Sequence, residues 1–109
     1  MQNHAKVVII GGGVVGCSIL YHLSKFGLKD CILLERNELT SGSSWHAAGN
    51  VHVISSDPNI SRMMAYTIGL YKEIEKESGH SVGFKPSGGF YLASNDVWAD
   101  YLKRERSKE

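Results

Sequence analysis

A glycine-rich segment, GGGVVG at residues 11–16, lies between two apolar patterns of different period. Before it, residues 6–10 (KVVII) form a largely β-branched run, which is typical of a strand buried on both faces of a parallel sheet. After it, apolar residues recur at spacings of three and four over residues 14–26, which predicts a helix. Residues 31–35 (CILLE) predict a second strand. The order strand, helix, strand indicates an α/β fold that begins with one right-handed βαβ unit.

The three spaced glycines Gly11, Gly13 and Gly16 match the pattern G-x-G-x-x-G. In a dinucleotide-binding turn the first glycine permits the tight turn, and the second lets a diphosphate approach the backbone. The third lets the helix pack closely against the strand. The backbone N–H groups at the start of the helix, including those of Val14 and Val15, would then face the diphosphate beside the positive end of the helix dipole.

An acidic residue, Glu35, ends the second strand pattern at roughly the 20-residue distance from the glycines that this class of turn requires. A carboxylate at this position accepts hydrogen bonds from ribose hydroxyls and repels a 2′-phosphate, so the pattern disfavours NADP. It does not separate FAD from NAD. The alternative is an ordinary glycine turn with a solvated Glu35, but the register of strand, glycines, helix and acid favours a nucleotide site.

The rest of the chain predicts less regular structure. Residues 37–51 lack either periodicity and predict a long loop, which usually has a binding role. The pair Asp57 and Pro58 predicts the start of a second helix over residues 58–78. Residues 89–93 (GFYLA) predict a strand, and residues 96–106 a third helix that runs to the end of the sequence without a stop signal. A doubly wound sheet needs more strands than these, so we expect a fragment of a longer protein.

The composition bears on whether the chain binds nucleic acid, a membrane or a metal. The formal net charge is +1, with 42% hydrophobic and 21% charged residues, so nucleic acid is not an expected partner. No apolar stretch is long enough for a membrane span or a secretory signal, and we expect a cytoplasmic protein, or a matrix protein if a mitochondrial leader has been removed. The cysteines Cys17 and Cys31 lack metal-ligand spacing, so we expect reduced packing residues and no metal site.

Residues 34–49, LERNELTSGSSWHAAG, narrow the interpretation to one family. This stretch resembles the amino terminus of the dimethylglycine dehydrogenase and sarcosine dehydrogenase family, within the D-amino-acid-oxidase-like flavoproteins. The similarity extends from KVVIIGGGVVGCSILYHLSKFG through GLYKEIEKESG to GGFYLA, which is nearly the whole chain. It implies the N-terminal part of a Rossmann-like FAD-binding domain, with residues 36–56 as a flavin-contacting loop and residues 82–109 as the start of a substrate-domain region.

The resemblance also implies that the flavin is covalently bound. In this family the histidine of a W-H-x-A-G segment carries the flavin, and that histidine corresponds to His46. Other cofactor-binding candidates lie in the same loop or beside Glu35: Arg36, Ser43, Ser44, Trp45, Ala48 and Gly49. The alternatives are a polar loop for the serines, a surface charge for Arg36 and core packing for Trp45.

The activity that the resemblance implies is oxidation of an N-methylated amine, such as dimethylglycine or sarcosine, by hydride transfer to flavin. Catalytic residues are expected downstream of residue 109, as are regions that would contact folate and an electron-transfer flavoprotein. Asn50 departs from the apolar residue that many relatives carry, which leaves the substrate open. The alternatives are a D-amino-acid dehydrogenase or glycine-oxidase-like enzyme with noncovalent FAD, and a non-catalytic truncated chain.

Overall fold

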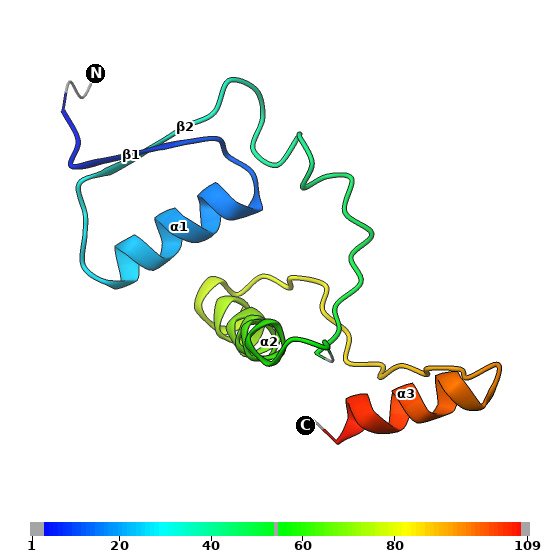
Figure 1. Cartoon of the computed structure of the whole chain (residues 1–109). Helices are drawn as coiled ribbons and strands as arrows, with labels where there is room; N and C mark the ends of the chain where they lie inside the picture. The colour runs from blue at the N-terminus through cyan, green and yellow to red at the C-terminus, as the bar shows by residue number, and fades with distance from the viewer. Residues whose placement is uncertain (1–3, 54, 108–109) are drawn as a thin grey trace. The chain divides into compact units, whose positions relative to one another are not determined.

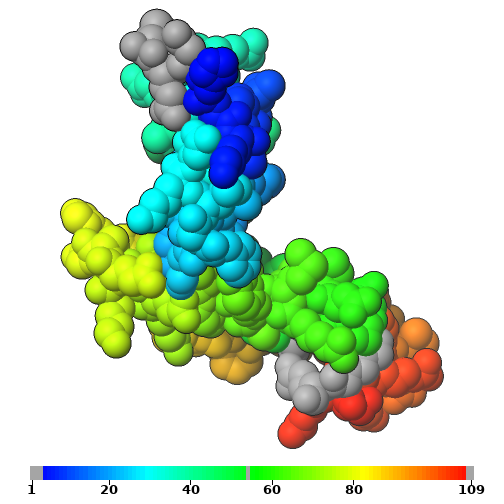
Figure 2. All heavy atoms as spheres, turned by 90° about the vertical axis from the view of Figure 1, so that its left-hand side faces the viewer, coloured from blue at the N-terminus to red at the C-terminus, as the bar shows by residue number. Residues whose placement is uncertain are grey.

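The computed structural model describes residues 4–53 and 55–107, which divide into two compact units at the junction of Asn50 and Val51 (Figure 1). The first unit contains strand β1 (Val7–Ile10), helix α1 (Val14–Lys25) and strand β2 (Cys31–Leu34). In Figure 2 its atoms run from blue to green-cyan, and those of the second unit run from green to red.

The two strands of the first unit are parallel, and their register pairs Val7 with Cys31 and Ile10 with Leu34. Helix α1 connects them and packs against both, which completes the βαβ unit expected from the sequence. Because β1 and β2 are parallel, the turn after β1 and the residues after β2 both lie at the carboxyl edge of the sheet. In open α/β sheets this edge is where ligands bind.

The sheet of the first unit is covered on one face. Ile9 is 8% exposed, whereas Val8 and Ile10, which alternate with it along β1, are 50% and 86% exposed. The expectation that β1 is buried on both faces is therefore wrong for this chain. The physical reason is that α1 is the only helix among residues 4–50, and one helix shields one face of the sheet.

Helix α1 ends where the sequence predicts. The Phe26 N–H donates to the His22 carbonyl, and Gly27 then adopts a φ of +83°, a conformation that glycine adopts without strain. The thiols of Cys17 and Cys31 are free and partly buried, and they donate to the carbonyl oxygens of Gly12 and Leu28 at 3.6 and 3.3 Å. These contacts agree with the expectation that both cysteines are packing residues.

The second unit contains helices α2 (Pro58–Ser78) and α3 (Asp96–Arg106). The Asp57 carboxylate caps α2 by accepting from the N–H groups of Asn59 and Ile60 at 2.7 and 3.3 Å. Gly79 ends that helix with a φ of +70°. The helix predicted from the Asp57–Pro58 pair is confirmed, and its capping side chain is the aspartate.

The strand predicted over residues 89–93 is not formed. Residues 84–93 carry no strand, and the side chains of Phe90 and Leu92 are 99% and 91% exposed. A β-strand requires a neighbour that completes its ladder of hydrogen bonds, and no segment among residues 55–107 pairs with this one. The apolar pattern of GFYLA is that of a strand, but the described residues of this unit supply no partner to pair with it.

Within the two described ranges of the chain, no helix combines the length and apolarity needed to cross a bilayer.

Candidate functional site

The glycine-rich turn links the ends of both strands. Gly11 has a φ of +106°, which only glycine adopts readily, and its N–H donates to the Leu34 carbonyl at 2.8 Å. Gly16 is buried in the first turn of α1. A Cβ built on Gly16 would collide with the Gly11 carbonyl oxygen, so the helix approaches the strand more closely than any larger residue would allow.

Gly12 is held from both sides by the segment that follows β2. Its N–H donates to Glu35 Oε2 at 2.7 Å, and its carbonyl accepts from Thr40 N–H at 2.9 Å. The other carboxylate oxygen, Glu35 Oε1, accepts from Asn37 N–H at 2.9 Å. The acidic residue and the glycine-rich turn, 23 positions apart in the sequence, are thus in direct contact.

These contacts favour the ionised form of Glu35. The hydrogen bond from Asn37 N–H and then that from Gly12 N–H lower the pKa of the Glu35 carboxyl, with a smaller contribution from the neighbouring Arg36. The carboxylate is therefore charged at neutral pH. An ionised carboxylate offers about four lone-pair positions, so hydrogen bonds to Gly12 and Asn37 leave acceptor capacity for hydroxyl groups of a ligand.

The start of α1 has the features of an anion-binding helix terminus. The residue before the helix, Gly13, supplies no side-chain cap, and the first turn carries no acidic residue. Ser44 approaches this terminus from the loop, and its Oγ accepts from Val14 N–H at 2.8 Å. The same oxygen lies 3.1 Å from the position that a Cβ on Gly13 would occupy. A diphosphate fits these residues, because N–H groups, a hydroxyl and the positive end of α1 converge there and the first turn of the helix carries no acidic residue.

His46 lies further along the same loop and is exposed. Its Nδ1 is 3.0 Å from the Gly42 carbonyl oxygen, and its backbone N–H donates to the Ser43 carbonyl. A carbonyl oxygen only accepts hydrogen bonds, so Nδ1 carries the proton in this contact. In the neutral ring the remaining nitrogen, Nε2, then has the free lone pair and is the nucleophilic atom.

The structure brings together one group of the predicted site residues: Gly11, Gly13, Val14, Gly16, Glu35 and Ser44. The others are exposed, namely Val15, Arg36, Ser43, Trp45, His46, Ala48 and Gly49. The Trp45 side chain is 78% exposed, so the alternative of core packing for this residue is not observed.

Sequence reasoning missed Gly12, Leu39 and Thr40. A Cβ on Gly12 would lie 2.5 Å from Leu39 Cδ2 and 3.0 Å from Glu35 Cβ, so the loop after β2 packs directly over this glycine. Thr40 has a φ of +65°, which orients its N–H toward the Gly12 carbonyl. The available signal was the glycine at position 12, because the G-x-G-x-x-G pattern allows any residue at its second position.

Comparison with known proteins assigns the class. The model of the family described as FAD dependent oxidoreductase (DAO) matches residues 6–109, and the chain belongs to this family.

Three relatives refine the assignment. The chain is 43% identical over 107 residues to human mitochondrial dimethylglycine dehydrogenase, covering 98% of this chain and 12% of that protein. It is 42% identical over 105 residues to human mitochondrial sarcosine dehydrogenase, covering 95% and 11%. It is also 40% identical over 102 residues to 4-methylaminobutanoate oxidase (formaldehyde-forming) from Paenarthrobacter nicotinovorans, covering 94% and 12%. The chain thus spans about an eighth of the length of these relatives.

Proposed function

We propose that residues 6–49 bind the adenosine diphosphate part of FAD in an oxidoreductase that acts on N-methylated amines. The observation that carries the proposal is the contact between Glu35 and Gly12 beside the start of α1, where the N-cap residue Gly13 has no capping side chain. This contact puts a ribose-binding acid and a diphosphate-binding turn at one edge of the sheet. The family of FAD-dependent oxidoreductases supports FAD as the dinucleotide.

Each residue of the turn has a defined task in this proposal. The N–H groups of Gly13 and Val15, together with the dipole of α1, would stabilise the negative diphosphate. The Ser44 hydroxyl can keep its bond from Val14 N–H and donate its own proton to a phosphate oxygen, because a hydroxyl both accepts and donates. The Glu35 carboxylate would accept from the ribose hydroxyls, and Arg36 would lie beside the adenosine.

We assign covalent attachment of the flavin to His46 through Nε2. The Gly42 carbonyl would hold the proton on Nδ1, so Nε2 would be the nitrogen whose lone pair bonds to the 8α carbon of the flavin. The 8α methyl group would lose a proton, the flavin ring would take up the two electrons, and oxygen would then reoxidise it. The small residues Ala48 and Gly49 leave room for the ring near this histidine. Trp45, which has no place in the core, is available to cover the ring.

The substrate class follows from the names of the relatives, of which two are dehydrogenases of dimethylglycine and sarcosine and one is an oxidase of 4-methylaminobutanoate. When bound, FAD would accept a hydride from the N-methyl carbon of such an amine. Electron-transfer flavoprotein or oxygen would then take the electrons, and folate would take the one-carbon unit where it is not released as formaldehyde. We place the protein in the mitochondrial matrix for a processed eukaryotic chain and in the cytoplasm otherwise.

The covalent assignment is tested by acid precipitation of the purified enzyme that contains these residues. We expect the flavin absorbance to stay with the precipitated protein, and His46→Gln to move it into the supernatant. The matched control is His52→Gln, a loop histidine six positions further along, which should leave the flavin attached. Flavin in the supernatant of the unsubstituted protein would contradict the covalent assignment. If that protein also oxidised D-alanine faster than sarcosine, the alternative of a D-amino-acid dehydrogenase with noncovalent FAD would be favoured.

A further inference from the structure

Thr40 has a backbone conformation that is normally left to glycine. Among residues 4–53 and 55–107 it is the one residue other than glycine with a positive φ, which is +65°. A β-branched side chain makes this conformation unfavourable, so it persists only where the surrounding contacts fix it. Both backbone groups of Thr40 are used: its N–H donates to the Gly12 carbonyl at 2.9 Å, and its carbonyl accepts from Trp45 N–H at 3.0 Å. Thr40 therefore joins the glycine-rich turn to the segment that contains His46.

This segment has a second contact with the glycine-rich turn. Residues 39–46 form consecutive turns, and we call residues 40–46 the anchored loop. At Ser44 the side-chain Oγ accepts from Val14 N–H at 2.8 Å. The bonds at Thr40 and at Ser44 are four positions apart in the sequence, so they restrict both the position and the orientation of the loop.

The anchored loop also determines the state of the His46 ring. The Gly42 carbonyl oxygen lies 3.0 Å from His46 Nδ1, which keeps the proton on Nδ1 and leaves the lone pair of Nε2 free. Gly42 is two positions after Thr40, so the direction of its carbonyl depends on how Thr40 is held. A reaction between two groups is faster when their geometry is fixed before the reaction begins.

We propose that Thr40 is a positioning residue for the attachment of flavin to His46, an inference that rests on the proposed function. By holding the anchored loop on the glycine-rich turn, Thr40 keeps Nε2 unprotonated and restricts the positions of the His46 ring. In the attachment a bond would form between Nε2 and the 8α carbon while the 8α methyl group loses a proton. The two electrons would pass to the flavin ring and then to oxygen.

Two substitutions test whether Thr40 holds the loop. Thr40→Pro removes the N–H and fixes φ at about −65°, whereas Thr40→Asn keeps the N–H and tolerates a positive φ. In NMR of the 109-residue chain without flavin, Thr40→Pro should raise the exchange rate of the Val14 amide at least about fivefold. It should also increase the Nε2–H tautomer of His46, read from the ¹⁵N shifts of the ring. Thr40→Asn should leave both quantities unchanged, and no effect of Thr40→Pro on either would overturn the proposal.

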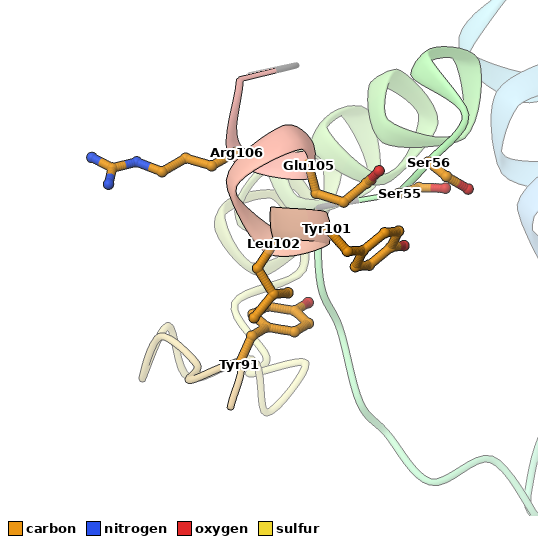
Figure 3. Close-up of a pocket in the computed structure, with 7 residues that line it drawn as sticks. All are labelled: Ser55, Ser56, Tyr91, Tyr101, Leu102, Glu105 and Arg106. Carbon is orange, nitrogen blue, oxygen red and sulfur yellow. The ribbon is translucent and has the colours of Figure 1, made fainter. Parts of the chain in front are cut away.

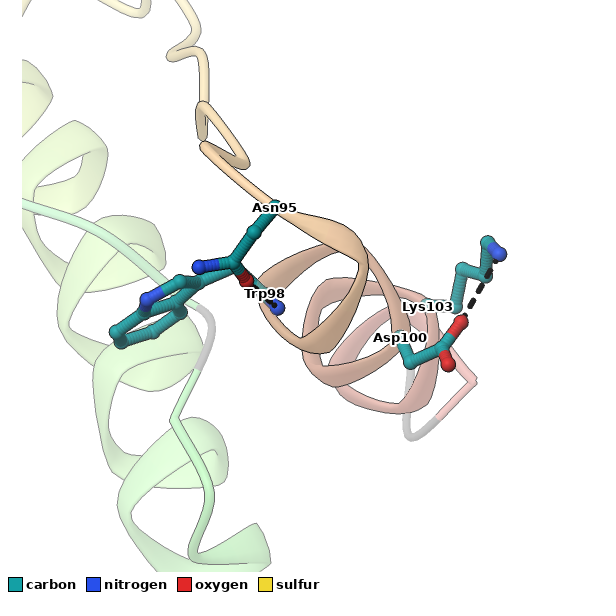
Figure 4. A network of polar contacts seen from close by, with 4 residues as sticks. All are labelled: Asn95, Trp98, Asp100 and Lys103. Carbon is teal, nitrogen blue, oxygen red and sulfur yellow. Dashed lines mark hydrogen bonds and ion pairs between the residues drawn. The ribbon is translucent and has the colours of Figure 1, made fainter.

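The second unit contains a matched reference bond. At the start of α3, Trp98 N–H donates to Asn95 Oδ1 at 3.0 Å (Figure 4). Like the bond at Val14, it joins a side-chain oxygen to an N–H at the start of a helix, but its acceptor is only three positions away. The exchange rate of the Trp98 amide should therefore be the same in Thr40→Pro and in the parent chain. A rise as large as that at Val14 would show a general loss of structure and overturn the local role of Thr40.

A second reference is the cavity of about 380 Å³ that Tyr91, Tyr101 and Leu102 help to line in the same unit (Figure 3). The amide signals of Tyr91 and Tyr101 report whether this unit keeps its tertiary structure. They should coincide in Thr40→Pro and in the parent chain. Displacement of these signals would show that the effect of the substitution is not confined to the anchored loop, which would also overturn the proposal.

The decisive measurement is the rate of covalent flavin attachment in the purified enzyme that contains these residues, prepared without flavin and mixed with saturating FAD. Thr40→Pro should lower the rate constant at least about tenfold and Thr40→Asn less than about twofold, because only the proline variant loses the positioning of His46. Saturating FAD removes any effect on affinity. Equal rates in Thr40→Pro and the parent would overturn the proposal while leaving the covalent assignment intact. Absence of attachment in the unsubstituted enzyme would instead contradict the covalent assignment, and the flavin-free NMR measurements would still decide whether Thr40 holds the loop.

Discussion

Glu35 Oε2 accepts a hydrogen bond from Gly12 N–H at 2.7 Å, which joins the residue after β2 to the turn after β1. Both groups lie at the carboxyl edge of a parallel pair of strands, so the contact closes one side of the candidate nucleotide site. It also stabilises the turn before any ligand binds.

Glu35→Gln should reduce the dependence of stability on pH. The folded state lowers the pKa of Glu35, so the stabilisation is fully present above the unfolded value, about 4.5, and is lost as pH falls through the folded value. The unsubstituted chain should therefore lose more stability between about pH 7 and pH 3 than the variant does. Urea unfolding followed by circular dichroism at both pH values measures this difference. Glu38→Gln, an exposed neighbour, is the control and should retain the pH dependence of the parent chain.

Gly16→Ala should destabilise the first unit by about 1–3 kcal/mol, because the added methyl group would overlap the Gly11 carbonyl oxygen. The informative control is Gly69→Ala in the middle of α2, where an added Cβ meets no atom within 4 Å. There the substitution should stabilise the helix by about 0.5–1 kcal/mol. Hydrogen exchange of the β1 and α2 amides separates the two effects. A similar loss of amide protection in both variants would argue against the close approach of α1 to the Gly11 carbonyl at Gly16.

Ser44→Ala should cost about 0.5–1.5 kcal/mol, because Val14 N–H loses its acceptor. In the proposed site it should also weaken FAD binding, since one donor to the diphosphate is lost. Ser18→Ala is the matched control, because Ser18 is exposed on α1 and its hydroxyl contacts His22 Nδ1 and no backbone group of the glycine-rich turn. The measurement is the hydrogen-exchange rate of the Val14 amide together with the Kd for FAD. No change in either quantity would place Ser44 outside the site.

Asp57→Ala should shorten or fray the start of α2 and cost about 1 kcal/mol, because the Asp57 carboxylate satisfies two backbone N–H groups there. Asp57→Asn retains an oxygen acceptor and should cost much less. Circular dichroism and hydrogen exchange at Asn59 and Ile60 report the change. Equal exchange rates in the two variants would show that the side-chain cap is unimportant.

The βαβ unit could be predicted because a strand pattern, a glycine motif, a helix pattern and a second strand pattern follow one another in the order that this unit requires. The helix ends could be predicted because local chemistry determines them. Gly27 and Gly79 stop helices by adopting positive φ, and Asp57 caps α2 with its own side chain. These features depend on neighbours within a few positions. They are therefore readable without knowledge of the tertiary fold.

The remaining features depend on groups distant in the sequence. Residues 89–93 have the composition of a strand, but a strand needs a partner, and composition does not say whether one is present. The contact of Gly12 with Leu39 and Thr40 arises because the loop after β2 folds back over the turn, which no periodic pattern encodes. The motif located the glycine-rich turn and Glu35, but not the residues that hold them together.

The most direct test of the nucleotide site is an NMR titration of the 109-residue chain with FAD and, separately, with NADP⁺. We predict that FAD shifts the amide signals of Gly12, Gly13 and Val14 saturably. NADP⁺ should bind more weakly, because Glu35 repels its 2′-phosphate. Glu35→Gln should reduce the difference in affinity between FAD and NADP⁺. If FAD leaves these three amides unshifted, or if it shifts only signals outside residues 11–16, the glycine-rich turn does not bind the dinucleotide and the central claim fails.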